Sequence, residues 1–208
     1  AISALAQRLE RLRVLLLDPA RAVVRLVSIP ERVVIDETRS AYTLLSLFGL
    51  SVDAVVLNRV LPSELEAGYL GEWTRIQARE LERAKEQFEG LALKRLRFQP
   101  AEVLGVGALS EVARELYGEE DPGKQLGGAT PVRFVSEAGT PSLQLHLPHA
   151  LPGELDLRQA GAELVITAGP WRRRLLLPPS LERRSVKGAR LSAGTLHIHF
   201  EPAPGESR

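Results

Sequence analysis

The stretch VDAVVLNRV, Val52–Val60, decides the fold class of this sequence. Its apolar residues run on without the alternation of a strand that has one solvated face, so both faces of the strand should be covered. Such strands are typical of parallel sheets, in which helices pack on each side. Pro62 follows and ends the strand, because proline has no N–H to donate to a sheet ladder.

The segments around this strand alternate between strand and helix patterns. Short apolar runs end at proline or glycine, and amphipathic stretches with a helical period lie between them. Ser63 and Glu66 have the spacing of a helix-capping box. The expected order is a helix at about 3–17, a strand at 23–29, a helix ending at Gly49, the strand 52–60, a helix from Ser63 to Gly90 that breaks near Gly71, a strand at 91–98 and a helix at 108–118.

A change of period divides the chain in two. The stretch GEEDPGKQLGGATP, Gly118–Pro131, is rich in glycine and proline and has no hydrophobic pattern, which is typical of a flexible linker. Short alternating segments follow it and predict strands. We therefore expect an α/β domain over 1–120, a linker over 121–130 and a small all-β sandwich over 131–202. The alternating segments are SLQLHL, ELDLRQ, AELVITAG, RRRLLLP and TLHIHF.

Composition excludes several classes of function. The 27 Lys and Arg residues balance 26 Asp and Glu residues, so the net charge of +1 offers no positive field for nucleic acid. The chain has no cysteine, which removes disulfides, thiolate catalysis and Cys-based zinc sites. No apolar run approaches the roughly 20 residues that a membrane span needs, and no signal peptide is recognised. We expect a cytoplasmic protein with no direct membrane insertion.

One stretch imitates a phosphate-binding loop. Gly118, Gly123 and Lys124 fit the pattern G-x-x-x-x-G-K. A true loop follows a strand and opens a helix, whereas this one follows a helix, carries three acids and has Gln125 where a magnesium ligand belongs. The linker interpretation is favoured.

His197 and His199 raise the question of a metal site. Their spacing of two places both on one face of a strand, with Leu196 and Ile198 on the other. The apolar face predicts the core, so both imidazoles should face solvent. A third ligand would have to come from His146 or from a carboxylate on a neighbouring strand, and we predict no metal site.

Two parts of the sequence resemble known families. The first part resembles the C-terminal half of the nucleotide-binding domain of ArsA-type ATPases. It consists of residues 25–62, which include RLVSIPERVVIDETRSAYTLLSLFGL and the strand quoted first, and of residues 100–118, PAEVLGVGALSEVARELYG. That family contains arsenite-transporting ATPases and ATPases that target tail-anchored proteins. Residues 143–200 look like a small heat-shock, α-crystallin-like domain. The fold class expected is therefore α/β plus all-β, a partial parallel-sheet half-domain of a phosphate-loop-type ATPase followed by an α-crystallin-like β-sandwich.

The resemblance implies a role for Asn58, in LNRVLP, as the asparagine that reads the adenine base. On the residues alone, Asn58 either binds a ligand at the end of a parallel strand or merely ends that strand. Arg97 stands where the family has a proline that flanks the base. The family's phosphate loop, switch aspartate and magnesium ligands have no counterpart in these residues, so no catalytic residue is predicted.

The expected function is the C-terminal portion of an ArsA-type ATPase that contributes the adenine side of the nucleotide site and a β-sandwich binding domain. The complete ATPase would use ATP and Mg, whereas this chain alone should bind neither tightly and should be inactive. Expected partners are the missing N-terminal half or a homo-oligomer partner, with a membrane transporter or tail-anchored cargo as further candidates. The alternative is a non-enzymatic, chaperone-like or protein-binding module on a degenerate α/β scaffold.

Overall fold

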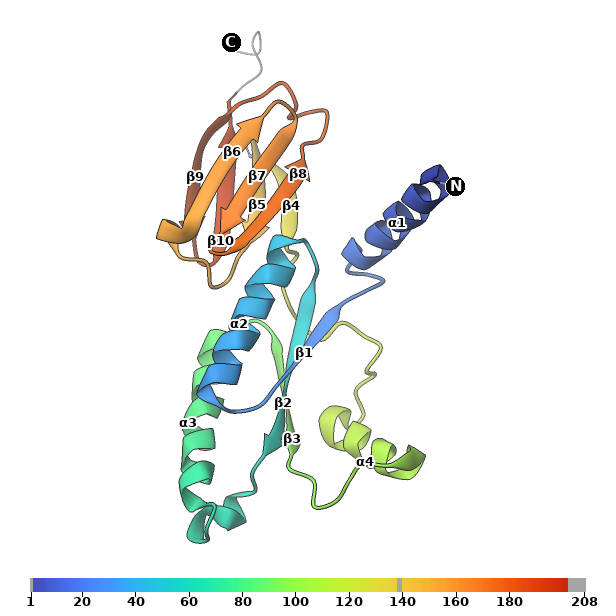
Figure 1. Ribbon diagram of the computed structural model, residues 1–208, viewed down its shortest axis with the longest axis vertical. Coiled ribbons are helices and arrows are strands. Elements are labelled where there is room, and N and C mark those ends of the chain that lie inside the picture. The colour runs from blue at the N-terminus through green and yellow to red at the C-terminus, as the bar shows by residue number, and fades with distance from the viewer. Residues whose placement is uncertain (1, 138–139, 202–208) are drawn as a thin grey trace. The chain divides into compact units, whose positions relative to one another are not determined.

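A computed structural model describes residues 2–137 and 140–201 (Figure 1). The expected end of the sandwich at residue 202 lies outside the described residues. The chain forms two compact units, one of residues 1–41 and 52–129 and the other of residues 42–51 and 130–208. In the described part, no helix is long and apolar enough to cross a membrane.

The first unit contains the parallel sheet that the sequence predicts, with strand order β1-β2-β3. Its strands are β1 (Val24–Ser28), β2 (Val52–Val60) and β3 (Ala92–Arg97). The central strand β2 is buried continuously from Val52 to Leu57, which confirms that both of its faces are covered. Leu26 lies beside Val55, and Val55 lies beside Leu93, so one apolar row crosses all three strands.

Four α-helices accompany this sheet: α1 (Ile2–Leu17), α2 (Arg32–Leu47), α3 (Gly71–Gln87) and α4 (Gly105–Tyr117). Figure 1 shows α2 and α3 on one side of the sheet and α4 on the other. Ile35 of α2 and Ala84 and Phe88, at the end of α3, are almost fully buried. The hydroxyl of Thr38 in α2 bonds Ser28 at the end of β1, which fixes the helix against the strand.

The break predicted near Gly71 is present, and the backbone at Gly71 accounts for it. Residues Ser63–Ala67 form a 3₁₀ helix, and α3 begins only at Gly71. A Cβ atom on Gly71 would lie 2.1 Å from the carbonyl oxygen of Glu66, so only glycine fits this turn. The capping box expected of Ser63 and Glu66 does not form: Pro62 and not Ser63 is the N-cap residue, and proline has no side-chain group that could cap the helix.

An ion pair between β1 and β2 organises one end of the first unit. Two nitrogens of the Arg25 guanidinium lie 3.2 and 3.1 Å from the two carboxylate oxygens of Asp53, whose side chain is fully buried. The hydrogen bond with Asp53 raises the pKa of Arg25. Arg25 also donates to the backbone carbonyls of Pro122 and Lys124, and Asp53 accepts the N–H of Leu126.

These bonds turn the predicted linker into a strap, which we define as residues 118–129. The strap has no helix or strand, in agreement with its composition. Its backbone is nevertheless tied to the sheet, and the N–H of Gly128 donates to the carbonyl of Gly90. A Cβ atom on Gly128 would lie 2.1 Å from the carbonyl oxygen of Val52, so glycine is required at this approach. The strap therefore belongs to the first unit, and the flexible boundary stays a prediction.

The second unit is an antiparallel β-sandwich, as predicted. One sheet has the order β4-β5-β10-β9 and the other the order β6-β7-β8. Buried leucine, isoleucine and phenylalanine side chains alternate with solvated ones along the inner strands. The strands are β4 (Val132–Glu137), β5 (Thr140–His146), β6 (Leu155–Ala160), β7 (Glu163–Ala168), β8 (Trp171–Leu176), β9 (Val186–Ser192) and β10 (Thr195–Phe200), with a short 3₁₀ helix at Pro152–Glu154.

Two features of the sandwich differ from expectation. The sequence patterns do not predict strands β4 and β9. Both strands lie at sheet edges, where charged and polar side chains are common and weaken the alternation of apolar residues. The run of three arginines on β8 predicts a solvated strand, but Arg173 is buried and donates to the carbonyl of Leu47 at 2.5 Å. Leu47 belongs to the same unit. The charge of Arg173 is thus used inside the second unit.

We predict that Asp53→Asn destabilises the first unit by about 3 kcal/mol, because it leaves the Arg25 guanidinium without its carboxylate. Urea unfolding followed by fluorescence measures this. The chain has two tryptophans, Trp73 in α3 and Trp171 in β8, so a Trp171→Phe background reports on the first unit alone.

The matched control is Glu72→Gln, which removes a carboxylate from an exposed ion pair with Arg75 on α3. Exposed pairs contribute less than about 1 kcal/mol, so this variant should unfold near the urea midpoint of the parent. Equal midpoints for Asp53→Asn and Glu72→Gln would show that the buried pair does not organise this unit.

Candidate functional site

The candidate site lies at the carboxyl ends of the three parallel strands. In open α/β sheets this edge is where ligands bind, since the strand ends and the loops that follow them meet there. β2 ends with Asn58, Arg59 and Val60, and β3 ends with Arg97. Val60 pairs with Arg97, and the N–H of Phe98 donates to the carbonyl of Val60, so the two strand ends lie side by side.

Asn58 sits in an irregular turn of β2. The pairing of β2 with β3 shifts between Leu57 and Val60, and Arg59 has a φ of 56°, in the left-handed region that asparagine and glycine favour over arginine. The Asn58 side-chain oxygen accepts the N–H of Arg59 at 2.8 Å, which holds this turn. The Asn58 amide nitrogen has no hydrogen-bond partner among the residues that the structure describes, and the side chain is half-buried.

Gln77 supports the turn from α3, and sequence reasoning does not find it. Its side-chain oxygen accepts the N–H of Leu61 at 2.8 Å, and its nitrogen donates to the carbonyl of Arg59 at 3.2 Å. Both the oxygen and the nitrogen of the Gln77 side-chain amide thus bond the backbone that follows Asn58. One signal for it exists: Gln77 lies four residues before Leu81 on the buried face of α3, where a polar side chain requires a partner.

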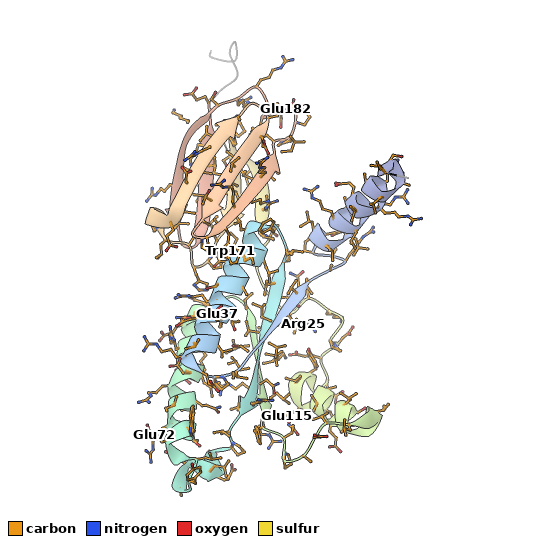
Figure 2. All side chains as sticks on the ribbon, in the orientation of Figure 1. Arg25, Glu37, Glu72, Glu115, Trp171 and Glu182 are labelled. Carbon is orange, nitrogen blue, oxygen red and sulfur yellow. The ribbon has the colours of Figure 1, made fainter. Side chains whose placement is uncertain are left out.

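Glu115 of α4 holds the end of β3. Its carboxylate accepts the backbone N–H and the Nε of Arg97, and it also bonds the side chain of Gln99. Figure 2 shows Glu115 beside the strand ends of the first unit. Burial acts to raise the pKa of Glu115, but the hydrogen bonds from Arg97 and Gln99 outweigh it and hold that pKa below its ordinary value.

The stretch that imitates a phosphate loop has a structural role. Gly118 ends α4, and the backbone N–H of Gly123 donates to the Asp121 side chain two residues before it. The carbonyls of Pro122 and Lys124 face Arg25, which pairs with Asp53 at the start of β2, whereas Asn58 lies near the end of that strand. Carbonyl oxygens are acceptors and repel phosphate, so the arrangement suits a guanidinium and not a phosphate group.

The two C-terminal histidines lie on the outer face of β10, with Leu196, Ile198 and Phe200 buried beneath them. His197 lies across from Gln144 and Arg190, so a guanidinium borders it. His146, one of the candidates for a third ligand, pairs with Thr195, and its Nε2 lies 3.0 Å from the hydroxyl of Tyr42 in the same unit. Burial lowers the pKa of His146. Within the described residues, no three metal-ligating side chains gather.

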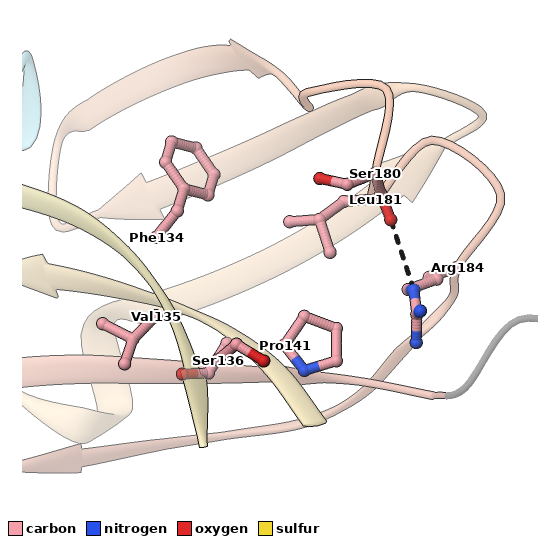
Figure 3. A pocket seen from close by; sticks show the side chains of 8 residues that line it. Phe134, Val135, Ser136, Pro141, Ser180, Leu181 and Arg184 are labelled. Carbon is pink, nitrogen blue, oxygen red and sulfur yellow. Dashed lines mark hydrogen bonds between the residues drawn. The ribbon is translucent and has the colours of Figure 1, made fainter. Parts of the chain in front are cut away.

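The sandwich has a hollow of about 290 Å³ beside β4 (Figure 3). Phe134 of β4 lies opposite the buried Leu143 yet is half exposed. Arg184 closes one side by donating to the carbonyl of Ser180 at 3.2 Å. The hollow is lined by Phe134, Val135, Ser136, Pro141, Ser142, Ser180, Leu181 and Arg184.

We predict that zinc leaves the melting temperature of this chain unchanged. His197 and His199 have no third ligand beside them among the described residues, and Arg190 opposes a cation there. Thermal unfolding of the parent and of a His197→Ala, His199→Ala double variant, with and without zinc, measures this. A zinc-dependent rise in the parent that the double variant lacks would establish a metal site.

Comparison with known proteins matches two stretches of the chain to domain families. The model of the family described as "Anion-transporting ATPase" matches residues 1–118, and the model described as "HSP20-like domain found in ArsA" matches residues 138–200. Among solved structures, HSP18.5 from E. histolytica aligns over 38% of this chain and 91% of its own length, with 14% identity and a TM-score of 0.30.

Curated relatives match almost the whole chain. A protein of Chlorobaculum tepidum named "Putative arsenical pump-driving ATPase" is 35% identical over 193 residues, which are 93% of this chain and 48% of that protein. "Putative arsenical pump-driving ATPase 1" of Aquifex aeolicus is 26% identical over 202 residues, covering 95% of this chain and 51% of its own length. The chain therefore spans about half the length of these relatives. It belongs to the anion-transporting, ArsA-type ATPase family and carries that family's HSP20-like domain.

Proposed function

We propose that this chain is the C-terminal portion of an ArsA-type ATPase and contributes the adenine side of its nucleotide site. The observation that carries the proposal is the incomplete hydrogen bonding of the Asn58 side-chain amide. Its oxygen holds the Arg59 N–H with one lone pair, which leaves a second lone pair and the whole amide nitrogen for a ligand. An amide that presents a donor and an acceptor side by side matches the edge of adenine.

The surroundings of Asn58 support this role. Gln77 from α3 and Glu115 from α4 hold the backbone of both strand ends with their side chains, so the Asn58 amide is presented on fixed backbone. Arg97, which replaces the family's base-flanking proline, is tied to Glu115 through both its backbone and its guanidinium. We propose that ATP and Mg bind the complete ATPase, with the phosphate-binding groups supplied by its other half.

The open edge of the sheet at β1 supports a role for the other half of the ATPase as a partner of this chain. In the described residues β1 pairs with β2 alone, so the outer backbone groups of β1 have no strand beside them. Val27 in the middle of β1 is 66% exposed, although an interior strand of an α/β sheet is covered on both faces. Continuation of the sheet beyond β1 by the other half of the ATPase would cover both features.

A second candidate function concerns the sandwich. Phe134 faces the inner side of its sheet but remains half exposed above the hollow of Figure 3. An inward aromatic side chain that its own domain does not cover favours a protein-binding module, which is the non-enzymatic alternative. The two functions are compatible in one ATPase, with the sandwich binding protein and the first unit binding the base.

We predict that the chain binds adenosine in preference to guanosine by about tenfold, and that Asn58→Asp abolishes this preference. Aspartate keeps an acceptor for the Arg59 N–H but has no donor for the base, so the substitution separates binding from folding. A bidentate amide contact accounts for discrimination of this size. NMR titrations of the chain with the two nucleosides measure both dissociation constants.

Asn58→Ala is the companion variant. It loses the turn contact as well as the base contact and should lower the stability of the first unit by about 1 kcal/mol, unlike Asn58→Asp. Equal binding of adenosine and guanosine by the parent, or a preference that survives Asn58→Asp, would remove Asn58 from the nucleotide site.

A further inference from the structure

The end of β2 contains a bulge, which is an extra residue in one of two paired strands. Between Leu57 and Val60 the pairing advances three residues along β2 but only two along β3. The extra residue lies at Asn58 or Arg59, and Arg59 has the left-handed φ of 56°. Bulges are rare between parallel strands, and those next to functional sites re-aim a side chain.

The conformation of Arg59 is unfavourable by itself. In the left-handed region the Cβ atom of a residue approaches the following carbonyl oxygen, so glycine, which has no Cβ, is the usual occupant. A residue with a side chain stays in this region only where the contacts around it determine its conformation. The bulge at Arg59 therefore depends on contacts that other residues supply.

Gln77 of α3 supplies two of these contacts, one on each side of the bulge. Its side-chain nitrogen donates to the carbonyl of Arg59 at 3.2 Å, and its side-chain oxygen accepts the N–H of Leu61 at 2.8 Å. Gln77 is only 8% exposed, so water competes little for the two bonds. A third contact comes from the Asn58 side chain, which accepts the N–H of Arg59.

The bulge sets the direction of the Asn58 amide. Side chains alternate between the two faces of a regular strand, and a shift of one residue in the pairing moves a side chain to the other face. A β2 without the bulge would therefore turn either Asn58 or Val60 to the opposite face. The base contact proposed for Asn58 requires the direction that the bulge gives it.

We propose that Gln77 is a positioning residue that determines the nucleoside specificity of the Asn58 site. It acts through the backbone of Arg59 and Leu61, which it holds in the bulged form, and has no contact with the base. This inference rests on the adenine role proposed for Asn58. It adds the residue on which the discrimination between adenine and guanine depends.

Gln77→Leu tests the proposal, because leucine has a similar size and can make neither backbone bond. NMR titrations with adenosine and guanosine measure the preference, and the backbone chemical shifts of Arg59 report its conformation. We expect the adenosine preference of about tenfold to fall to about twofold or less. The Arg59 shifts should move from left-handed towards extended values.

Arg59→Gly in the Gln77→Leu background is the rescue variant. Glycine adopts the left-handed region without strain, so the bulge should form again and the adenosine preference should return to within about twofold of the parent value. A residue that only stabilised the unit would not be replaced in this way. If Gln77→Leu does not fold, Gln77→Glu gives the same test, because it keeps the acceptor for Leu61 but sets a carboxylate oxygen against the Arg59 carbonyl.

Gln87→Leu is the matched control, since it makes the same substitution on the same helix α3. The side-chain oxygen of Gln87 is buried and has no hydrogen-bond partner in the part of the chain that the structure describes. Removal of this amide should leave both the adenosine preference and the Arg59 shifts as they are in the parent.

Three results would overturn the proposal. An adenosine preference that survives Gln77→Leu but not Asn58→Asp would show that Gln77 does not position the site, while the nucleotide role of Asn58 would stand. A loss in Gln77→Leu that Arg59→Gly does not restore, or that Gln87→Leu shares, would assign Gln77 to stability alone. Equal binding of adenosine and guanosine by the parent would overturn this inference together with the nucleotide role.

Discussion

The buried pair of Arg25 and Asp53 is the constraint on which the first unit depends. A carboxylate without solvent contact at the start of β2 is costly unless a charge of the opposite sign meets it. Arg25 meets it with two nitrogens and has further donors for the strap. One guanidinium thereby sets β1 against β2 and holds residues 122–126 over the end of the sheet. An apolar pair would fill the space but would leave the strap carbonyls without donors.

Fixing one end of the strands leaves the other end for function. The strap closes the amino end of β2, whereas Asn58 and Arg97 lie at the carboxyl ends. There the polar side chains that helices contribute, Gln77 and Glu115, bind backbone and hold it in an irregular form. Asn58 differs from them because its amide nitrogen is left without a protein partner in the described residues. The adenine role that we propose for Asn58 thus lies at the end of the strands that the strap does not close.

Local patterns predict most of this fold. The uninterrupted apolar run of β2 requires a strand covered on both faces, and the alternation in β10 requires a strand with one buried face. The structure has both. Edge strands β4 and β9 cannot be predicted in this way, because an edge tolerates polar residues and glycine and their sequences therefore lack a clear period. Asn58 enters through resemblance, and its geometry supplies a physical reason for the proposed role. Arg25 and Asp53 are 28 residues apart, and their pairing follows from the register of two strands, which no local pattern reveals.

Comparison of adenosine with magnesium-ATP tests the central claim most directly. If this chain supplies only the base side of the site, the three phosphates add nothing, because phosphate affinity comes from backbone amides, a lysine and magnesium that belong to the other half. Isothermal titration or NMR titration of the same preparation should then give equal, weak dissociation constants for the two ligands, with and without magnesium. Binding of magnesium-ATP that is a hundredfold or more tighter than that of adenosine, by roughly the scale of a few charge-assisted hydrogen bonds, would contradict the account.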